Sequence, residues 1–357
     1  MARIDQLFRY MKDQGGSDLH LSAALRPHIR KHGHLEEVPN WPAFTDASLR
    51  ELLREITSDA QWSHYERTLD LDFAHSLEGV GRFRANYLNH ENGAGAVFRI
   101  IPEKILSLEE LAVPPAVGTL AELEQGLVLV TGPTGSGKST TLAAIINRIN
   151  ETFAKHIVTI EDPVEFVHLN KKCTISQREV GSNAKSFGSA LRAAIRQDAE
   201  VILVGEMRDY ETISLAITAA EMGILVFGTL HTNNAAKTID RLIDAFPTDQ
   251  QAQARTMLSE SLAGVVSQLL LRTANGNGRV AVHEILLKNA ALPNIIREAN
   301  TQMLASIIQA GKQQGMQAMD DALLSVVKSG KVKLEDALAK ATHKQRFTDA
   351  QSVPAGA

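Results

Sequence analysis

The chain has 357 residues, few aromatic and many aliphatic side chains, so it is long enough for two domains of the α/β class, each with its own core. A formal net charge of −4 excludes a global basic field, and we expect no direct nucleic-acid partner. The single cysteine, Cys173, excludes an internal disulfide and a multi-cysteine zinc site and fits a reducing cytosol, and the lack of a long apolar run predicts no transmembrane segment or signal peptide.

Residues 1–101 have the pattern of a small α+β domain. An amphipathic helix is predicted over 3–14, where apolar residues recur at helical spacing, and a second helical stretch is expected over 46–66. Short runs with strand-like alternation lie at 18–21, 27–30, 69–73, 82–88 and 96–101. The pattern predicts an antiparallel sheet with helices on one face, and the prolines of 102–118 predict a connector to the next domain.

Residues 119–347 have a different pattern of apolar residues, which predicts a second domain. Near-continuous apolar runs alternate with helical segments, at 127–131, 157–160, 201–204, 225–230 and 280–286. Such runs are typical of a mostly parallel sheet that is buried on both faces, with helices between its strands. After residue 287 the pattern is helical, and the tail 348–357 is expected to be disordered. The predicted fold class is therefore α/β.

The most informative motif is Gly132-Pro133-Thr134-Gly135-Ser136-Gly137-Lys138-Ser139, which fits the phosphate-binding loop G-x-x-x-x-G-K-[ST] and continues into Thr140. It follows an apolar run and precedes a helical pattern, which is the context that the motif requires. The glycines let the backbone close around phosphate oxygens, toward which the next helix points its N–H groups. We expect Lys138 to reach the β- and γ-phosphates and Ser139 to bind Mg²⁺. A glycine-rich turn without a ligand is the alternative, which the combination of Lys, Ser and context disfavours.

Two acidic clusters follow later strands of the second domain. Glu161-Asp162-Pro163-Val164-Glu165 follows the run 157–160, and Glu206 ends the run 201–204 in the manner of a Walker B motif, where Asp is commoner. Open α/β sheets bind ligands at the carboxyl ends of their strands, so both clusters are candidates for contacts to metal and water. Helix capping or ordinary solvation is the alternative for either cluster taken alone.

Four basic side chains are further candidates. His231 ends the run 225–230, where it could sense a γ-phosphate, hold a neighbouring carboxylate, or be purely structural. Arg82 and Arg84 alternate onto one face of a strand, and Arg99 lies on a later strand. Most surface arginines are solvated charges, yet an ATPase ring needs positive charge supplied across an interface. The residues alone leave these alternatives open.

Taken in order, the motifs resemble those of the secretion-type ATPases that serve type IV pili and type II secretion, and within them the pilus retraction motors. The matching segments are Ser17–Ser22, Arg82-Phe83-Arg84, Gly93–Arg99, Gly132–Thr140, Glu161–Glu165, Val204–Asp209, Gly228–Thr232 and Met257–Leu262. The resemblance extends from about residue 5 to residue 345. It implies a PAS-like N-terminal domain followed by a RecA-like P-loop ATPase domain with C-terminal helices.

The resemblance also implies an activity and the residues that perform it. A homohexamer would bind ATP and Mg²⁺ between the two domains of each chain and convert hydrolysis into pilus retraction and twitching motility. The implied Walker B acid is Glu206, the implied general base is Glu165, and Ser139, Glu161 and Asp162 would support metal and water. His231 falls in the family's His box, and Arg82, Arg84 and Arg99 become candidates for phosphate contacts.

The implied partners and rivals follow from the same resemblance. The motor would be cytoplasmic and would dock on an inner-membrane platform protein, with a paralogous pilus ATPase as a further partner. Extension and type II secretion ATPases usually carry a four-cysteine zinc insertion and an extra N-terminal domain, neither of which this sequence shows. The alternatives are an accessory retraction ATPase paralogue, a DNA- or protein-translocating secretion ATPase, and a non-catalytic regulator that binds nucleotide.

Five residues in three segments of the chain depart from the family pattern. The segment 291–298 resembles the retraction motif A-I-R-N-L-I-R-E, but Leu292-Pro293 replace its Ile-Arg. Ile224 stands where a second His of the His box is usual, so a mechanism that needs two histidines is not expected. Ala199-Glu200 replace the usual Pro-Asp ahead of the Walker B strand.

Overall fold

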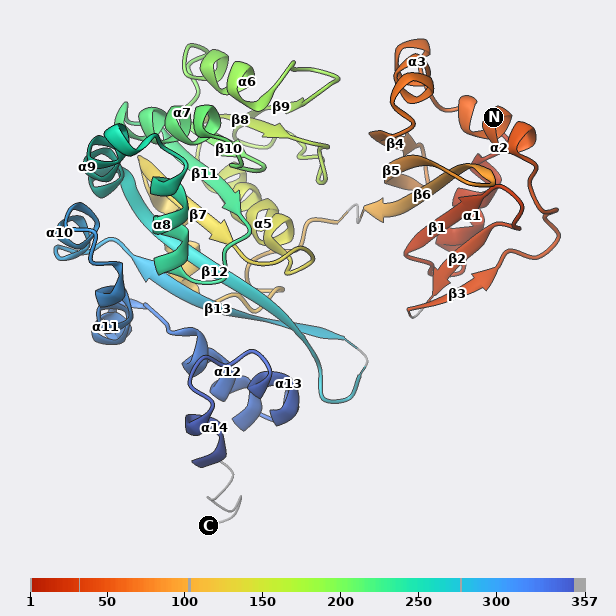
Figure 1. Ribbon diagram of the computed structural model, residues 1–357. Coiled ribbons are helices and arrows are strands. Elements are labelled where there is room, and N and C mark those ends of the chain that lie inside the picture. Colours follow the sequence, from red (N-terminus) through yellow and green to blue (C-terminus); the bar gives the residue numbers. More distant parts are fainter. Residues whose placement is uncertain (1, 32, 102–103, 277, 350–357) are drawn as a thin grey trace. The chain divides into compact units, whose positions relative to one another are not determined.

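The computed structural model describes residues 2–31, 33–101, 104–276 and 278–349, which form two compact units (Figure 1). The first unit takes the chain up to residue 104 together with the segment 162–167, and the second takes the remainder. Domain borders at residues 101, 118 and 347 stay predictions, and residues 350–357 of the predicted tail lie outside the described residues. None of the helices in these described ranges combines the length and apolar character needed to cross a bilayer.

The first unit is a six-stranded antiparallel sheet, in the order β3-β2-β1-β6-β5-β4, with three helices. Its elements are α1 (Asp5–Asp13), β1 (Asp18–Ser22), β2 (His28–Lys31), β3 (His34–Glu37), α2 (Asp46–Arg54), α3 (Asp59–Thr68), β4 (Leu71–Leu77), β5 (Gly81–His90) and β6 (Gly93–Ile101). The stretch 46–66, predicted as one helix, is two helices, because Ser58 has an extended backbone and its side chain caps the second helix in a capping box.

Strand alternation divides this sheet into a buried and an open face. On β5, Phe83 and Tyr87 are fully buried in a core shared with the three helices, whereas Arg82 and Arg84 alternate onto the other face. Phe8 of α1 stacks on Phe83 with ring centroids 4.3 Å apart. One face of the sheet therefore holds the core, and the other face is available for polar side chains.

The second unit is a seven-stranded sheet, in the order β13-β12-β7-β11-β10-β8-β9, in which every neighbouring pair except β12 and β13 is parallel. Its strands are β7 (Gly126–Thr131), β8 (His156–Glu161), β9 (Thr174–Glu179), β10 (Val201–Val204), β11 (Leu225–Leu230), β12 (Leu262–Arg272) and β13 (Arg279–Leu287). Its helices are α4 (Pro115–Thr119), α5 (Lys138–Thr152), α6 (Phe187–Ala194), α7 (Tyr210–Glu221), α8 (Ala235–Asp244), α9 (Gln251–Ser261), α10 (Leu292–Arg297), α11 (Leu304–Ala310), α12 (Met319–Lys328), α13 (Leu334–Leu338) and α14 (Gln345–Asp349). The predicted α/β fold class is confirmed.

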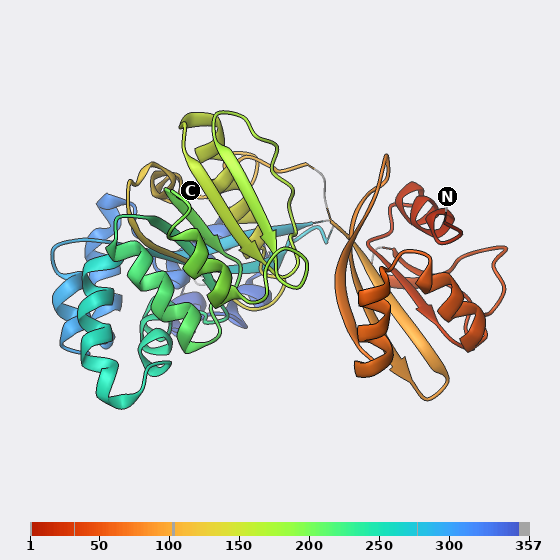
Figure 2. The ribbon, with the colours of Figure 1, turned by 90° about the horizontal axis from the view of Figure 1, so that it is seen from above.

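Helices cover both faces of this sheet (Figure 1 and Figure 2). Leu127 and Leu129 of β7 pack in a core with helices α6 to α11, and Val128 and Val130 of the same strand pack in a second core with α4 and α5. Three apolar residues of the predicted connector 102–118 also lie in this second core: Leu108, Val113 and Val117. The central strands are thus buried on both sides, as their continuous apolar sequences indicate.

A buried histidine on β13 makes the stability of the second unit depend on pH. His283 is 1% exposed, and burial lowers its pKa to about 4. The unfolded chain takes up this proton near pH 6.5, so the stability that the neutral ring contributes is complete above that pH and is lost as the pH falls toward 4.

We therefore predict that His283→Leu reduces the loss of unfolding free energy between pH 7 and pH 5 by about 2 kcal/mol. Urea unfolding at the two pH values measures this difference. His34→Leu, at an exposed position of β3, is the matched control and should leave the pH dependence as it is in the parent protein. Equal losses in the parent and in His283→Leu would show that the proton uptake lies elsewhere.

Candidate nucleotide-binding site

The predicted phosphate-binding loop connects β7, an interior strand of the sheet, to helix α5. Its glycines Gly132, Gly135 and Gly137 have φ values of +146°, +76° and +88°, a region that other residues adopt only with strain. At Gly132 a Cβ atom would overlap the Gln268 carbonyl oxygen and come within 2.6 Å of Ser136 Oγ. All three glycines are therefore required by the backbone conformation, and Gly132 is required also by the close approach of the loop to β12.

The start of helix α5 leaves its donors available for an anion. Gly137 occupies the N-cap position and provides no side-chain cap, so the first N–H groups of this 15-residue helix have no capping side chain. Lys138 Nζ donates to the carbonyl oxygens of Gly132 (2.9 Å) and Pro133 (3.1 Å), which holds the ammonium group against the loop. Pro133, Thr134 and Gly135 are exposed, and Ser139 and Thr140 are half-buried in the first turn. The loop is open to a ligand from outside.

Gln268 of β12 supports the buried side of the loop. The sequence alone did not identify this residue. Its side chain is almost fully buried; Nε2 donates to the Ser136 carbonyl oxygen (2.6 Å), and Oε1 accepts from Thr141 Oγ1 (2.7 Å). One amide therefore ties the loop to helix α5. The signal in the sequence was a lone amide in the apolar run of 262–271, but its partners lie more than a hundred positions away.

The Walker B glutamate and the His-box histidine meet at the carboxyl edge of the sheet. His231, just after β11, lies 2.9 Å from Glu206, just after β10, measured from Nε2 to Oε1, and Arg208 Nε pairs with the same oxygen. Burial alone would raise the pKa of Glu206, but the charges and hydrogen bonds of Arg208 and His231 outweigh it and lower the pKa. Glu206 is therefore ionised at neutral pH, as a metal contact requires.

Glu161 ends β8 at the same edge of the sheet. Its Oε1 accepts from Thr159 Oγ1 (2.7 Å) and from Gln177 Nε2 on β9 (3.4 Å). Strands β7, β11, β10 and β8 are consecutive neighbours and parallel, so their carboxyl ends bring the phosphate loop, His231, Glu206 and Glu161 to one edge.

The remaining predicted residues lie together in the first unit. The segment 162–167, which holds Asp162 and Glu165, packs there: Arg82 Nε donates to the Val164 carbonyl oxygen (3.0 Å), and Arg84 Nη1 lies 3.9 Å from Glu165 Oε1. Arg99 is directly opposite Arg84 across β5 and β6. The three predicted arginines and the predicted base, Glu165, thus all belong to the first unit.

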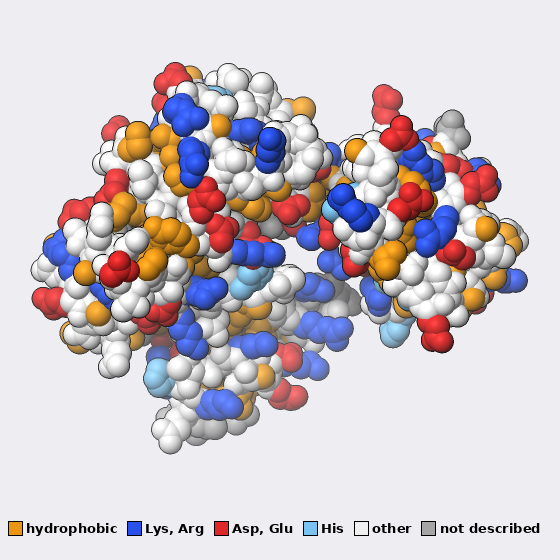
Figure 3. Space-filling view, turned by 45° about the horizontal axis from the view of Figure 1, so that its top comes forward, with side chains coloured by type: hydrophobic (Ala, Val, Ile, Leu, Met, Phe, Trp, Pro, Cys, Tyr) orange, Lys and Arg blue, Asp and Glu red, His pale blue; other side chains and the backbone are white. Residues whose placement is uncertain are grey.

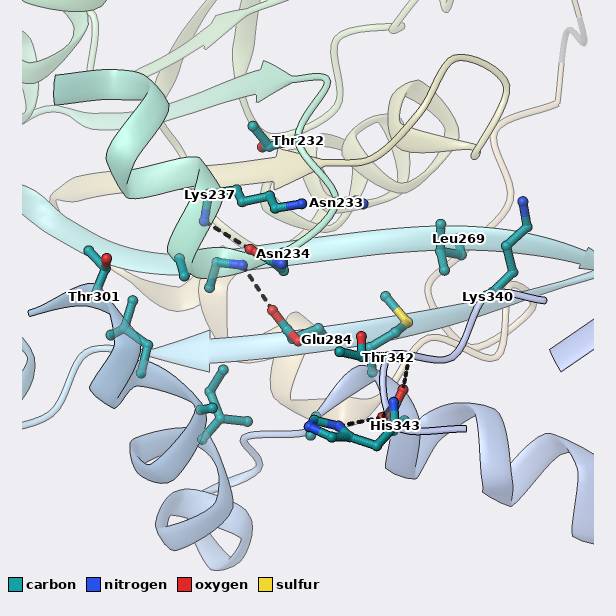
Figure 4. Close-up of a pocket in the computed structure, with 18 of the residues that line it drawn as sticks. Thr232, Asn233, Asn234, Lys237, Leu269, Glu284, Thr301, Lys340, Thr342 and His343 are labelled. Carbon is teal, nitrogen blue, oxygen red and sulfur yellow. Dashed lines mark hydrogen bonds and ion pairs between the residues drawn. The ribbon is translucent and has the colours of Figure 1, made fainter. Parts of the chain in front are cut away.

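A cavity of about 1100 Å³ in the second unit opens beside the phosphate loop (Figure 4). Pro133 and His231 line it, together with the start of α8 and residues of the C-terminal helices. At its floor, Glu284 accepts from the Ala235 N–H (2.9 Å), so a β13 carboxylate caps α8, and Asp320 accepts from the N–H of Thr342 and that of His343. These carboxylates are engaged in holding the C-terminal elements.

The donor set fits Mg²⁺ bound jointly by protein and nucleotide. Within the described ranges, no group of three or more His, Cys, Asp or Glu residues could hold a metal ion alone. Mg²⁺ commonly takes one or two carboxylates and completes its shell with phosphate oxygens and water. The ionised Glu206 and the hydroxyl of Ser139, at the start of α5, match that mode of binding.

The departures from the family pattern lie away from this edge. Ile224 precedes β11, whereas His231 follows it, so the two are separated by roughly 20 Å of strand. Glu200 Oε2 accepts from the His156 N–H (3.1 Å) at the opposite end of β8. Pro293 lies in the first turn of α10, where a backbone N–H is not needed.

The fold and this sheet edge define the class of the protein: it is an α/β protein with a P-loop built to bind nucleotide phosphates. Both positive and negative side chains lie on the face of each unit shown in Figure 3.

The chain belongs to the type II/IV secretion system protein family, which matches residues 4–339. It is 49% identical over 344 residues to the type IV pilus retraction ATPase PilT of Pseudomonas aeruginosa, a match covering 96% of this chain and 99% of PilT. It is 51% identical over 322 residues to a twitching motility protein of Neisseria gonorrhoeae, covering 90% and 86% of the two chains. A crystal structure of the pilus retraction motor PilT with bound ADP superposes with a TM-score of 0.90 at 42% identity, covering 98% and 100%. The predicted family is confirmed.

Gln268→Leu tests the support beneath the phosphate loop. Leucine keeps the volume, but the Ser136 carbonyl and the Thr141 hydroxyl lose their partner, so we expect the affinity for a fluorescent ATP analogue to fall about tenfold. Equilibrium titration measures the affinity, and circular dichroism checks the fold. Gln253→Leu, on the exposed side of α9, is the matched control. An unchanged affinity in Gln268→Leu would mean that the loop holds its shape without the amide.

Proposed function

We propose that this protein is a hexameric Mg-ATP-hydrolysing motor that powers type IV pilus retraction, and with it twitching motility. The observation that carries the proposal is the P-loop of Gly132–Thr140 at one sheet edge with Glu206, in a chain that aligns with PilT over nearly the full length of both. The retraction function rather than extension is supported by the names of the two similar proteins and by the segment 291–298.

The proposed roles follow from the positions of the side chains. Lys138 and the N–H groups at the start of α5 hold the β- and γ-phosphates, and Ser139, Glu206 and Asp162 would hold Mg²⁺. When bound, Mg²⁺ neutralises charge on the phosphate oxygens. Water attacks the γ-phosphorus while Glu165 takes its proton, the bond to the β-phosphate oxygen breaks, and ADP and phosphate result.

Other residues keep these groups in place or stabilise charge. His231 and Arg208 keep Glu206 ionised and oriented, through the contacts to its Oε1 atom. Glu161 supports the attacking water. Arg82, Arg84 and Arg99 contact the phosphates and raise the affinity for ATP, either in the same chain or across an interface.

The proposal extends to mechanical coupling. Nucleotide that contacts both domains would bind their closed arrangement better than the open one, and a ligand shifts a conformational equilibrium only through such a difference in affinity. The connector 102–118 is the proposed hinge. The proposed partners are five further copies of the chain, an inner-membrane platform protein and a paralogous pilus ATPase, at the cytoplasmic side of the membrane.

ATP turnover of the purified protein and three variants tests the chemistry. We expect Mg-dependent turnover to fall at least about 100-fold in Lys138→Ala, Glu165→Gln and Glu206→Ala, because each removes a group that acts on the phosphates, the water or the metal. Native mass spectrometry in the same ATP-containing buffer should give a hexamer. His64→Gln, on the exposed surface of α3, is the control.

Each rival predicts a different result. A non-catalytic regulator would show no turnover in the parent protein, and a DNA-translocating ATPase would be stimulated by DNA. A hexamer that stays active as Glu165→Gln would keep the motor and move the base to Glu161 or Glu206. Cells that lack the gene should lose twitching, and the Lys138→Ala allele should fail to restore it; restored twitching would rule out ATP-driven retraction.

A further inference from the structure

The open face of the first unit's sheet carries a row of charged side chains that runs across four strands. In register, Arg30 on β2 faces Asp18 on β1, Asp18 faces Arg99 on β6, and Arg99 faces Arg84 on β5. Three guanidinium groups and one carboxylate give this row a net charge of +2. Directly opposed like charges, as in Arg99 and Arg84, destabilise a sheet, and here each of the two has an acidic neighbour: Asp18 accepts from Arg99, and Glu165 Oε1 lies 3.9 Å from Arg84 Nη1.

Asp18 is the buried centre of the row. Its side chain is 5% exposed, whereas that of Arg99 is 71% exposed. Asp18 Oδ1 accepts from Arg99 Nε (2.8 Å), Oδ2 accepts from Ser17 Oγ (2.7 Å), and Arg30 Nε lies 3.9 Å from Oδ2. The almost fully buried carboxylate of Asp18 therefore lies beside two more exposed arginines, Arg30 and Arg99.

Asp18 remains charged in the folded protein. Burial would raise its pKa, but the hydrogen bonds from Ser17 and Arg99 and the charge of Arg99 outweigh burial, and the pKa lies below the ordinary aspartate value. The strand alternation explains its place: Leu19 enters the core, so Asp18 must lie on the open face.

The contact with Asp18 uses only one edge of the Arg99 guanidinium group, and the side chain as a whole is largely exposed. The bond to Asp18 uses Nε, so the fork formed by the two terminal nitrogens is not engaged by this carboxylate. Such a fork matches the oxygens of a phosphate, and holding one edge reduces the side-chain entropy lost when the other edge binds.

We propose that Asp18 is a positioning residue that fixes Arg99, within the row of Arg30 and Arg84, for contact with the phosphate chain of the nucleotide. The inference rests on the proposed function, since it assumes that Arg99 contacts ATP. An ordinary structural ion pair between β1 and β6 would stabilise the sheet without affecting the affinity for ATP.

The test is a double-mutant cycle on KM and kcat for ATP in the full-length protein. We expect Asp18→Asn and Arg99→Gln each to raise the KM about tenfold and to change kcat by less than about twofold, and the double variant to match Arg99→Gln alone. Asp72→Asn is the matched control, because Asp72 lies on the same face and bonds only to Asn86 Nδ2 (3.3 Å) among the hydrogen bonds described. It should have the parental KM.

Arg99→Lys covers the case in which Asp18→Asn folds poorly. Lysine keeps the positive charge beside Asp18 but has no second edge, so the KM should again rise about tenfold while the melting temperature stays near that of the parent. An unchanged KM in Arg99→Lys, or effects of Asp18→Asn and Arg99→Gln that multiply to about a hundredfold in the double variant, would overturn the inference. Absence of turnover in the parent protein would instead overturn the proposed function.

Discussion

The contact between the phosphate loop and strand β12 determines the shape of the loop in the second unit. The loop can approach this strand only because Gly132 has no Cβ atom, and the approach lets Gln268 reach the Ser136 carbonyl from the buried side. A second polar contact, between Thr131 and Ser267 (2.9 Å), joins the same two strands one step earlier. The loop is thus held in a phosphate-binding shape by groups that are themselves buried, which is the general way to fix a site before its ligand arrives.

Each unit contains a carboxylate, Glu206 or Asp18, that stays ionised although much of its side chain is buried. Burial raises the pKa of both Glu206 and Asp18, and polar neighbours outweigh it and lower the pKa: Arg208 with His231 in one case, and Ser17 with Arg99 in the other. In each pair the acid is the more buried partner and the arginine the more exposed one. In both pairs the contact restricts the two side chains together, because the less exposed acid is held by the surrounding fold and the arginine is bonded to it.

The sequence predicted contiguous features well and distant pairings poorly. The phosphate loop was predictable because its glycines, Lys138 and Ser139 are close together in the sequence. The rule that parallel strands end at one edge placed Glu206 and His231 there, but it left open whether His231 contacts a carboxylate. Gln268 was not predictable, because its role depends on β12 lying beside β7, and no local pattern encodes that pairing. The helix predicted over 46–66 was broken by Ser58, whose capping preference competes with a continuous helical pattern. The catalytic, phosphate-binding and metal-binding roles assigned to all of the site residues, Lys138, Ser139, Glu206 and His231 included, stay predictions.

The departures from the family pattern become understandable through their positions in the fold. Proline at 293 costs little because the first turn of α10 has no intrahelical acceptor for that N–H, while Leu292 and Ile296 bury the same helix in the core. The retained arginine of the segment, Arg297, pairs with Glu260 of α9 (2.8 Å), so the part of the motif that contacts another helix is intact. Ile224 and Glu200 lie at the amino edge of the sheet, whereas the phosphate loop, Glu206 and His231 lie at its carboxyl edge. Because a strand of six residues separates the two edges by about 20 Å, a titratable side chain at 224 could not reach the nucleotide held by its own chain. The replacement of His by Ile at 224 therefore lies at the edge opposite to the phosphate loop, Glu206 and His231, and leaves those side chains in place.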